Sequence, residues 1–290
     1  MSIVGYTISL YKKFALIVAG KLGYAWTETA LMKAARGGDG GKICKLLASG
    51  ADINRMTAAK ETALFYCIKA IRPGCPETAV SGRLALQQAI AFMLLRQGAE
   101  FTTPNRNGEY PFALAIERGM SDVALFMLGK TGADTVKSQN CLVLACKANH
   151  PPVLVHRLAA ISPGAINAAL CAAAGAGGEE NARLLLSLGA DCSLHPVFDA
   201  VKAGCAPLVT EFLRRGDSPD VKKDGLPCAF FALERPDILR LLLDAGADCE
   251  AVFNDPRPGN EGREINLIEF AGGFSCYAEA LCMLETRAAR

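Results

Sequence analysis

The stretch Leu241–Asp248, with the sequence LLLDAGAD, recurs in variant form along the chain. Six leucine-rich segments end in a turn of this GAD type, and the glycines of the six turns are Gly50, Gly98, Gly132, Gly189, Gly216 and Gly246. Successive glycines lie 48, 34, 57, 27 and 30 residues apart. A turn that returns at intervals near 30 residues indicates an array of small units, each stacked on the next.

Two of the spacings are longer than the rest. The interval of 57 residues divides into 32 and 25 if the weaker ISPG turn, ending at Gly164, closes a degenerate unit. The interval of 48 residues implies an insertion of about 15 residues relative to a 33-residue period. We therefore expect irregular units near residues 71–86 and 140–192.

A second element precedes each leucine-rich segment and has the character of a helix start. Its clearest form is Gly108–Ala115, GEYPFALA, where Pro111 suits a first helical turn because that position needs no N–H donor. Related segments are Thr29–Ala35, Thr62–Cys67, Ala145–His150, His195–Val201 and Leu226–Ala232. The leucines that follow are spaced three or four residues apart, which predicts a second helix with one apolar face. Each unit is therefore expected to be helix–turn–helix.

These openings resemble the T-P-L-H-x-A motif of ankyrin repeats. The resemblance implies an all-α ankyrin-repeat solenoid of about eight units with an N-terminal capping helix. The expected units are 29–54, 61–101, 108–135, 140–165, 167–192, 195–220, 225–250 and 264–285. The domain plan is an apolar cap over 1–28 and a repeat domain over 29–290, in which 264–290 forms the C-terminal cap.

The match to the ankyrin motif is incomplete. No unit has the full Thr-Pro-Leu-His tetrad, and Met, Phe or Ala stands where the motif has His. In the family that His ties the loop to the helix by hydrogen bonds. The departure implies repeats that are less rigid than those of the consensus.

The first 25 residues are apolar. Their uncharged run Phe14–Gly20 is too short to cross a bilayer, which needs about 20 residues. Leu10, Phe14 and Ile17 suit one side of a helix, so we expect an end cap on the first repeat. A membrane contact through residues 1–25 and an export signal stay open as alternatives.

The amino-acid composition argues against a nucleic-acid-binding protein. The net charge is +2 and aromatic residues make up 7%, which gives neither the basic field nor the stacking platforms of a nucleic-acid binder. The 12 cysteines include no CxxC pair and recur at core positions of the repeats. We expect reduced thiols and a cytoplasmic location, with secretion into a host cell as a further possibility.

Motifs of catalysis are missing from the sequence. No GxxxxGK[ST], GxSxG or HExxH occurs, and the only histidines are His150, His156 and His195. We predict no catalytic, cofactor-binding or metal-binding residue and no small-molecule ligand. An enzyme or metal site in the divergent 140–190 stretch, using His150, His156, Cys141 or Cys146, remains the alternative. The RGDS segment Arg215–Ser218 resembles an adhesive motif, but its position in the repeat predicts an ordinary turn.

The sequence thus predicts a non-enzymatic scaffold that binds a partner protein through the concave groove and the inter-repeat loops. Arginine and aromatic residues anchor many interfaces, and lysines add charge. The loop residues that we select on this basis are Arg55, Phe101, Arg106, Lys137, Lys222, Lys223, Phe253 and Arg257. A bacterial effector that acts on a host protein is one form that such a scaffold could take.

Overall fold

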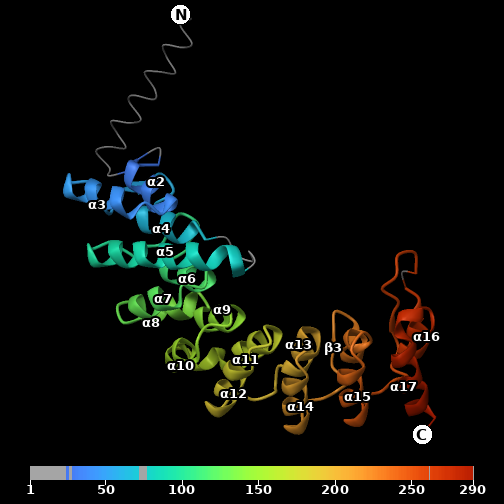
Figure 1. Ribbon diagram of the computed structural model, residues 1–290. Helices are drawn as coiled ribbons and strands as arrows, with labels where there is room; N and C mark the ends of the chain where they lie inside the picture. The colour runs from blue at the N-terminus through green and yellow to red at the C-terminus, as the bar shows by residue number, and fades with distance from the viewer. Residues whose placement is uncertain (1–23, 26–27, 72–76, 261, 290) are drawn as a thin grey trace, which may run out of the picture. The chain divides into compact units, whose positions relative to one another are not determined.

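The computed structural model describes residues 24–25, 28–71, 77–260 and 262–289 (Figure 1). It divides the chain into two compact units, Met1–Gln139 and Asn140–Arg290. Both units consist of helix pairs with short connections, and their strands are only two residues long. The expected all-α architecture is confirmed.

The described residues of the first unit form three helix pairs and a short extra helix. The pairs are α2 (Ala30–Gly37) with α3 (Gly40–Ala48), α4 (Ala63–Lys69) with α5 (Glu77–Arg96), and α6 (Pro111–Glu117) with α7 (Ser121–Leu128). Helix α8 (Ala133–Ser138) follows. Strand β1 (Tyr24–Ala25) pairs in parallel with β2 (Met56–Thr57).

In the second unit the described part of the chain forms five helix pairs, in which 3₁₀ turns extend or replace some helices. The first two pairs are α9 (Cys141–Lys147) with α10 (Pro152–Ile161), and α11 (Ile166–Gly175), preceded by η1 (Pro163–Ala165), with α12 (Glu179–Ser187). The third pair is α13 (Pro196–Ala203) with α14 (Ala206–Arg214), and the fourth is η2 (Cys228–Ala232) with α15 (Pro236–Asp244). The fifth pair is α16 (Leu267–Gly272) with α17 (Ala278–Ala288), which is preceded by η3 (Ser275–Tyr277). Two antiparallel hairpins join the last three pairs. They are β3 (Lys222–Lys223) with β4 (Leu226–Pro227), and β5 (Phe253–Asn254) with β6 (Glu264–Ile265).

The GAD-type turns end second helices as expected. After α15, Gly246 has φ +95° and the Ala247 N–H donates to the carbonyl of Leu242 at 3.0 Å. This left-handed turn satisfies a free carbonyl at the helix end, and a residue with a Cβ would be strained there. The turn at Gly132 differs, because the chain enters helix α8 instead of a loop.

Most of the apolar positions expected in second helices are buried. In α15, Leu239, Leu242 and Leu243 are 5% exposed or less. Two residues depart from the expected pattern, since Phe126 of α7 and Leu188 after α12 are each 39% exposed. Phe126 lies on the face of α7 that the packing leaves at the surface, and Leu188 is the C-cap residue after α12.

The long interval between Gly50 and Gly98 has a structural explanation. Helix α5 runs for 20 residues, whereas the second helices of the other pairs have between 8 and 11. Much of the expected insertion near 71–86 is therefore extra helix. Residues 72–76 lie outside the described part of the chain, and so does most of the expected N-terminal cap over 1–28. Within that cap, Tyr24–Ala25 is a strand and not part of a helix.

Side chains from one repeat cap the helix of the repeat before it. Gln87 Nε2 of α5 donates to the Arg36 carbonyl at 3.1 Å, and Arg235 Nη1 donates to the Val201 carbonyl at 3.0 Å. Asn181 Nδ2 donates in the same way to the His150 carbonyl at 2.9 Å. The first two bonds satisfy carbonyls in the last turn of a first helix, and the third reaches the turn that follows α9. All three tie neighbouring repeats together.

Candidate protein-interaction surface

Seven aromatic side chains form one connected cluster in the second unit. They come from α13, from η2, from hairpin β5–β6 and from the α16–η3 segment, and they are Phe198, Phe230, Phe231, Phe253, Phe270, Phe274 and Tyr277. These elements are first helices and inter-repeat hairpins, and only the hairpins are among the loops from which we selected binding residues. We call this set the aromatic cluster.

The rings of the aromatic cluster pack partly edge to face and partly tilted against one another. Phe231 lies 5.3 Å from Phe198 and 5.4 Å from Phe230, centroid to centroid, with interplanar angles of 71° and 83°. Phe230 continues the chain of rings to Phe270 at 5.0 Å, and Phe270 lies 5.2 Å from Phe274. Such pairs stabilise a packed arrangement beyond the burial of their area.

Local folding explains why two consecutive phenylalanines serve this cluster. In η2 the residues Cys228, Ala229 and Ala232 are buried, while Phe230 and Phe231 are half-buried. The tighter 3₁₀ turn directs small residues to the core and leaves the two rings at its margin. In the next hairpin Phe253 pairs with Ile265 across the strands and is buried against Phe230.

Part of the aromatic cluster reaches the surface. Phe274 is 38% exposed, and Phe230, Phe231 and Tyr277 are half-buried, whereas Phe253 and Phe270 belong to the core. Hairpin β5–β6 projects beside α16 at the red end of the chain (Figure 1). Partly exposed rings on a rigid packed base match the anchors found at protein interfaces.

Cationic groups lie over these rings. Lys202 Nζ is 5.6 Å from the Phe231 centroid, and Lys223 Nζ is 5.0 Å from that of Phe198. The Arg257 guanidinium lies 5.5 Å from the ring of Phe270 and 6.0 Å from that of Phe274. These distances fall within the range of cation–π attraction.

Two of these cations are neutralised within the chain. Lys223 Nζ is 2.8 Å from Asp199 Oδ2, and Arg257 forms two-pronged hydrogen bonds with Asp255, one of them at 2.6 Å. Those hydrogen bonds hold the pKa of Asp255 well below its usual range. Within the described residues, by contrast, neither Lys202 nor Lys222 has a carboxylate within 4 Å; Lys222 Nζ donates to the Val252 carbonyl at 2.8 Å.

Four of the residues selected from the sequence meet at this place. Lys223 and Arg257 lie over rings of the aromatic cluster, and Phe253 is one of its rings. Lys222 donates to the carbonyl of Val252, the residue before Phe253. Phe253 is only 3% exposed, so it supports the surface from below and is not a contact residue. Sequence reasoning missed Lys202 and the half-buried rings because it searched loops and not the faces of first helices. The adjacent phenylalanines Phe230 and Phe231 were the feature of the sequence that could have indicated this surface.

The other selected residues lie in the first unit. Arg55 is half-buried in the turn after α3, and Arg106 is exposed with its backbone N–H bonded to the Ala59 carbonyl at 2.9 Å. Phe101 is 9% exposed, so it too is a core residue and not a contact residue. Lys137 belongs to helix α8 and not to the expected loop, and its side chain lies outside the described part.

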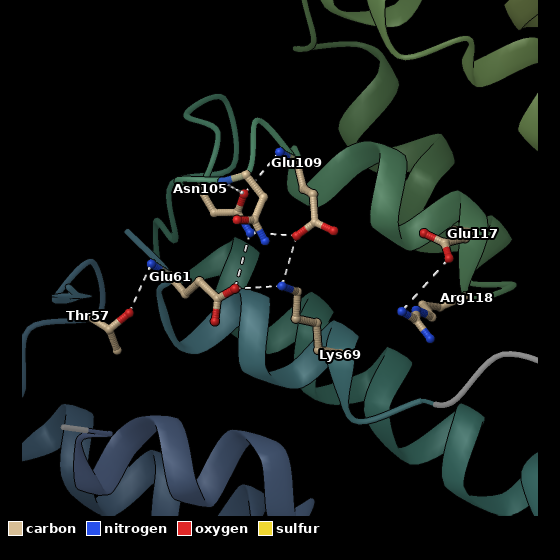
Figure 2. A network of polar contacts seen from close by, with 8 residues as sticks. Thr57, Glu61, Lys69, Asn105, Glu109, Glu117 and Arg118 are labelled. Carbon is tan, nitrogen blue, oxygen red and sulfur yellow. Dashed lines mark hydrogen bonds and ion pairs between the residues drawn. The ribbon is translucent and has the colours of Figure 1, made fainter. Parts of the chain in front are cut away.

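A polar network holds the loop that carries Arg106 (Figure 2). Lys69 Nζ lies 2.6 Å from Glu61 Oε1 and 3.0 Å from Glu109 Oε2. Buried Asn105 donates to both carboxylates, at 3.1 Å and 2.7 Å. The hydrogen bond from Asn105 and then that from Lys69 lower the pKa of Glu109. These bonds hold the loop in one conformation. They also pair the polar groups of Glu61, Lys69, Asn105 and Glu109 with one another.

The region 140–190 shows little that a catalytic thiol or a metal would need. Burial raises the pKa of the Cys141 and Cys146 thiols to about 12, which disfavours the nucleophilic thiolate. Across the described residues no three His, Cys, Asp or Glu side chains gather as a metal site would require. His150 is buried, and His156 is exposed on α10. This arrangement gives no support to the enzyme alternative.

The RGDS segment is a structural turn. The Asp217 side chain is fully buried, accepts the Val197 N–H at 3.0 Å and lies 2.8 Å from His195 Nδ1. An aspartate in this position cannot reach a receptor.

The described residues contain no single helix that is long and apolar enough to span a membrane. Helices Pro152–Ile161 and Pro163–Gly175 pass the length and composition criterion together, with a bend of 115° between them.

No protein-family model and no curated protein matches this chain. Among solved structures, the crystal structure of the human ASB11 ankyrin repeat domain is similar to it, with 18% identity, coverage of 88% of this chain and 97% of that chain, and a TM-score of 0.43. The repeat period, the helix openings and the helix pairs with their intervening hairpins give this chain the ankyrin-repeat fold.

Proposed function

We propose that this protein is a non-enzymatic interaction scaffold whose partner protein binds the exposed side of the aromatic cluster. The observation that carries the proposal is the half-exposed set of Phe230, Phe231, Phe274 and Tyr277, bordered by lysines on a single packed base. Repeat solenoids bind through extended surfaces of this kind. Aromatic residues are enriched at the centres of interfaces.

The first unit supports a second part of the same proposal. Arg106 is exposed on a loop that the Lys69 network holds in place, and Arg55 lies in the preceding inter-repeat turn. A fixed loop loses little entropy when it binds. We propose Arg55 and Arg106 as additional contact residues, with Lys222 and Lys223 serving the surface of the second unit.

The test is partner recovery by the tagged full chain from its native cell. The variant Phe231→Ala/Phe274→Ala should lose the partner that the wild type recovers. Phe126→Ala is the matched control, because Phe126 is 39% exposed, close to the 38% of Phe274, and also carries a lysine over its ring. Equal recovery by all three proteins would place the partner elsewhere and refute this surface.

An effector acting on a host protein would be one biological setting for the scaffold, and a cytoplasmic location would suit it. The free thiols of the described cysteines are compatible with a reducing compartment. Fractionation of expressing cells and of their medium would decide between retention and secretion. A liposome flotation assay with and without residues 1–25 would test the membrane alternative.

A further inference from the structure

We propose that the partner segment recognised by the aromatic cluster is an acidic peptide with at least one large apolar side chain. This inference rests on the proposed function and adds the chemical class of the partner. Its basis is a difference between two groups of cationic side chains. Lys223 and Arg257 have ion-pair partners, whereas Lys202 and Lys222 have no carboxylate in ion-pair range among the described residues.

Charge complementarity identifies the sign of the partner. Lys223 and Arg257 are paired with Asp199 and Asp255, so they contribute little net field. Lys202 and Lys222 are exposed, and within the described residues no carboxylate lies in ion-pair range of either ammonium group. Glu234 acts on the Tyr277 end of the cluster, where it adds to burial in raising the pKa of that phenol. Away from Tyr277, the ammonium groups of Lys202 and Lys222 attract carboxylates and disfavour a basic segment.

The two lysines reach the region of the aromatic cluster from different elements. Lys202 extends from α13 over the ring of Phe231. Lys222 extends from β3 toward the backbone at Val252, next to buried Phe253. Carboxylates on both sides of an apolar side chain would meet both ammonium groups while that side chain contacts the exposed rings.

The ring geometry favours a peptide over a nucleic acid. Stacking of bases needs open ring faces. Here the Phe231 ring has Lys202 over it and meets two neighbouring rings edge to face. Phe274 likewise has Arg257 over its ring and contacts Phe270 and Tyr277. The ring edges and the gaps between neighbouring rings stay accessible, and aliphatic or aromatic side chains can pack against them.

The test is selection of random peptides of about 12 residues, displayed on phage, against the full-length protein. Enriched peptides are then synthesised, and their affinities are measured by fluorescence anisotropy for three proteins. These are the wild type, Lys202→Glu/Lys222→Glu, and the control Lys130→Glu, which changes a lysine that lies over a single exposed ring in the first unit. Both lysines of the double variant are exposed, and a circular dichroism melt checks that it folds.

The proposal expects enriched peptides that combine Asp or Glu with Phe, Tyr, Trp or Leu. Their affinity should fall about tenfold or more in the double lysine variant and should stay within about twofold in the control. Raising salt from about 0.15 M to about 1 M should also weaken binding, because it shortens the screening length from about 8 Å to about 3 Å.

Three results would overturn the inference, and they separate it from the proposed function. Basic or uncharged peptides that lose affinity in Phe231→Ala/Phe274→Ala would keep the surface but refute the acidic partner. A random single-stranded RNA of about 20 nucleotides that displaces the peptides at equal affinity would refute the peptide class. A selection in which no peptide depends on Phe231 and Phe274 would refute both the inference and the proposed function.

Discussion

His195 and Asp217 join the two ends of one helix pair, α13 and α14, through a contact of 2.8 Å between Nδ1 and Oδ1. His195 has a left-handed backbone with φ +53° at the start of α13, and Asp217 lies in the turn that follows α14. The same carboxylate accepts the Val197 N–H in the first turn of α13. One buried aspartate therefore caps the helix and holds the residue before it.

We predict that Asp217→Ala destabilises the protein by about 2 kcal/mol, because it leaves a buried helix N–H without an acceptor. Equilibrium urea unfolding followed by circular dichroism measures this change. Asp248→Ala is the control, since Asp248 follows the GAD-type turn after α15 but is exposed, and it should cost about 0.5 kcal/mol or less. Equal costs for the two variants would show that Asp217 is not a capping residue.

Gly204 leaves the space through which Arg235 reaches the end of α13. A Cβ at Gly204 would collide with the Arg235 guanidinium, whose Cζ would lie 2.5 Å away, and Gly204 has φ +77°. Gly204→Ala should therefore lower the free energy of unfolding by about 2 to 3 kcal/mol, because it both strains the backbone and removes the Arg235 cap.

Gly216→Ala separates these two contributions. Gly216 has φ +89°, yet nothing lies within 4 Å of the position that an added Cβ would take, so its substitution costs only the strain. That strain is about 1 kcal/mol. The difference between the two variants in urea unfolding gives the worth of the Arg235 cap. In an Arg235→Ala background that difference should vanish, and its persistence would contradict the assignment.

The repeat architecture could be predicted from the sequence because leucine periodicity and left-handed glycine turns are local signals. The helix starting at Pro111 and the turn at Gly246 lie where the pattern places them. Contacts between residues distant in sequence carry no such signal. Lys69, Glu61 and Glu109 form an ionic network across two repeats, and the motif for one repeat does not reveal it.

The same limit explains the errors at the candidate site. Loop position alone suggested that Phe101 and Phe253 are exposed, but both fold back onto the core. Phe231 and Lys202 come together only when η2 packs against α13, so their pairing depends on tertiary structure. The incomplete ankyrin tetrad has a partial substitute, since Met32 Sδ accepts the Thr29 N–H at 3.4 Å in the capping box of α2.

Arg257 should control how acid unfolds the second unit. Its hydrogen bonds keep the pKa of Asp255 below the ordinary value of 3.8. A carboxylate with a depressed pKa stabilises the fold above its ordinary pKa, and that stability is lost as the pH falls toward the lower folded value. In Arg257→Gln the pKa of Asp255 rises, so acid unfolding should begin at higher pH.

A circular dichroism titration from about pH 7 to about pH 2 measures the midpoint of this transition. Arg263→Gln is the control, because Arg263 is an exposed arginine of the same hairpin. Its midpoint should match that of the wild type. Equal midpoints for Arg257→Gln and the wild type would show that the Asp255–Arg257 pair contributes nothing to the acid stability of the fold.

The cysteines should divide sharply by reactivity in the native protein. Burial raises the pKa of Cys67, Cys146 and Cys228 to about 12, so at about pH 8 roughly one thiol in ten thousand is the reactive thiolate. Brief iodoacetamide treatment followed by peptide mass spectrometry should label the exposed cysteines Cys44, Cys276 and Cys282. The buried thiols should react only after unfolding in urea. Rapid native labelling of Cys146 would contradict its place in the core and would reopen the case for a catalytic thiol in residues 140–190.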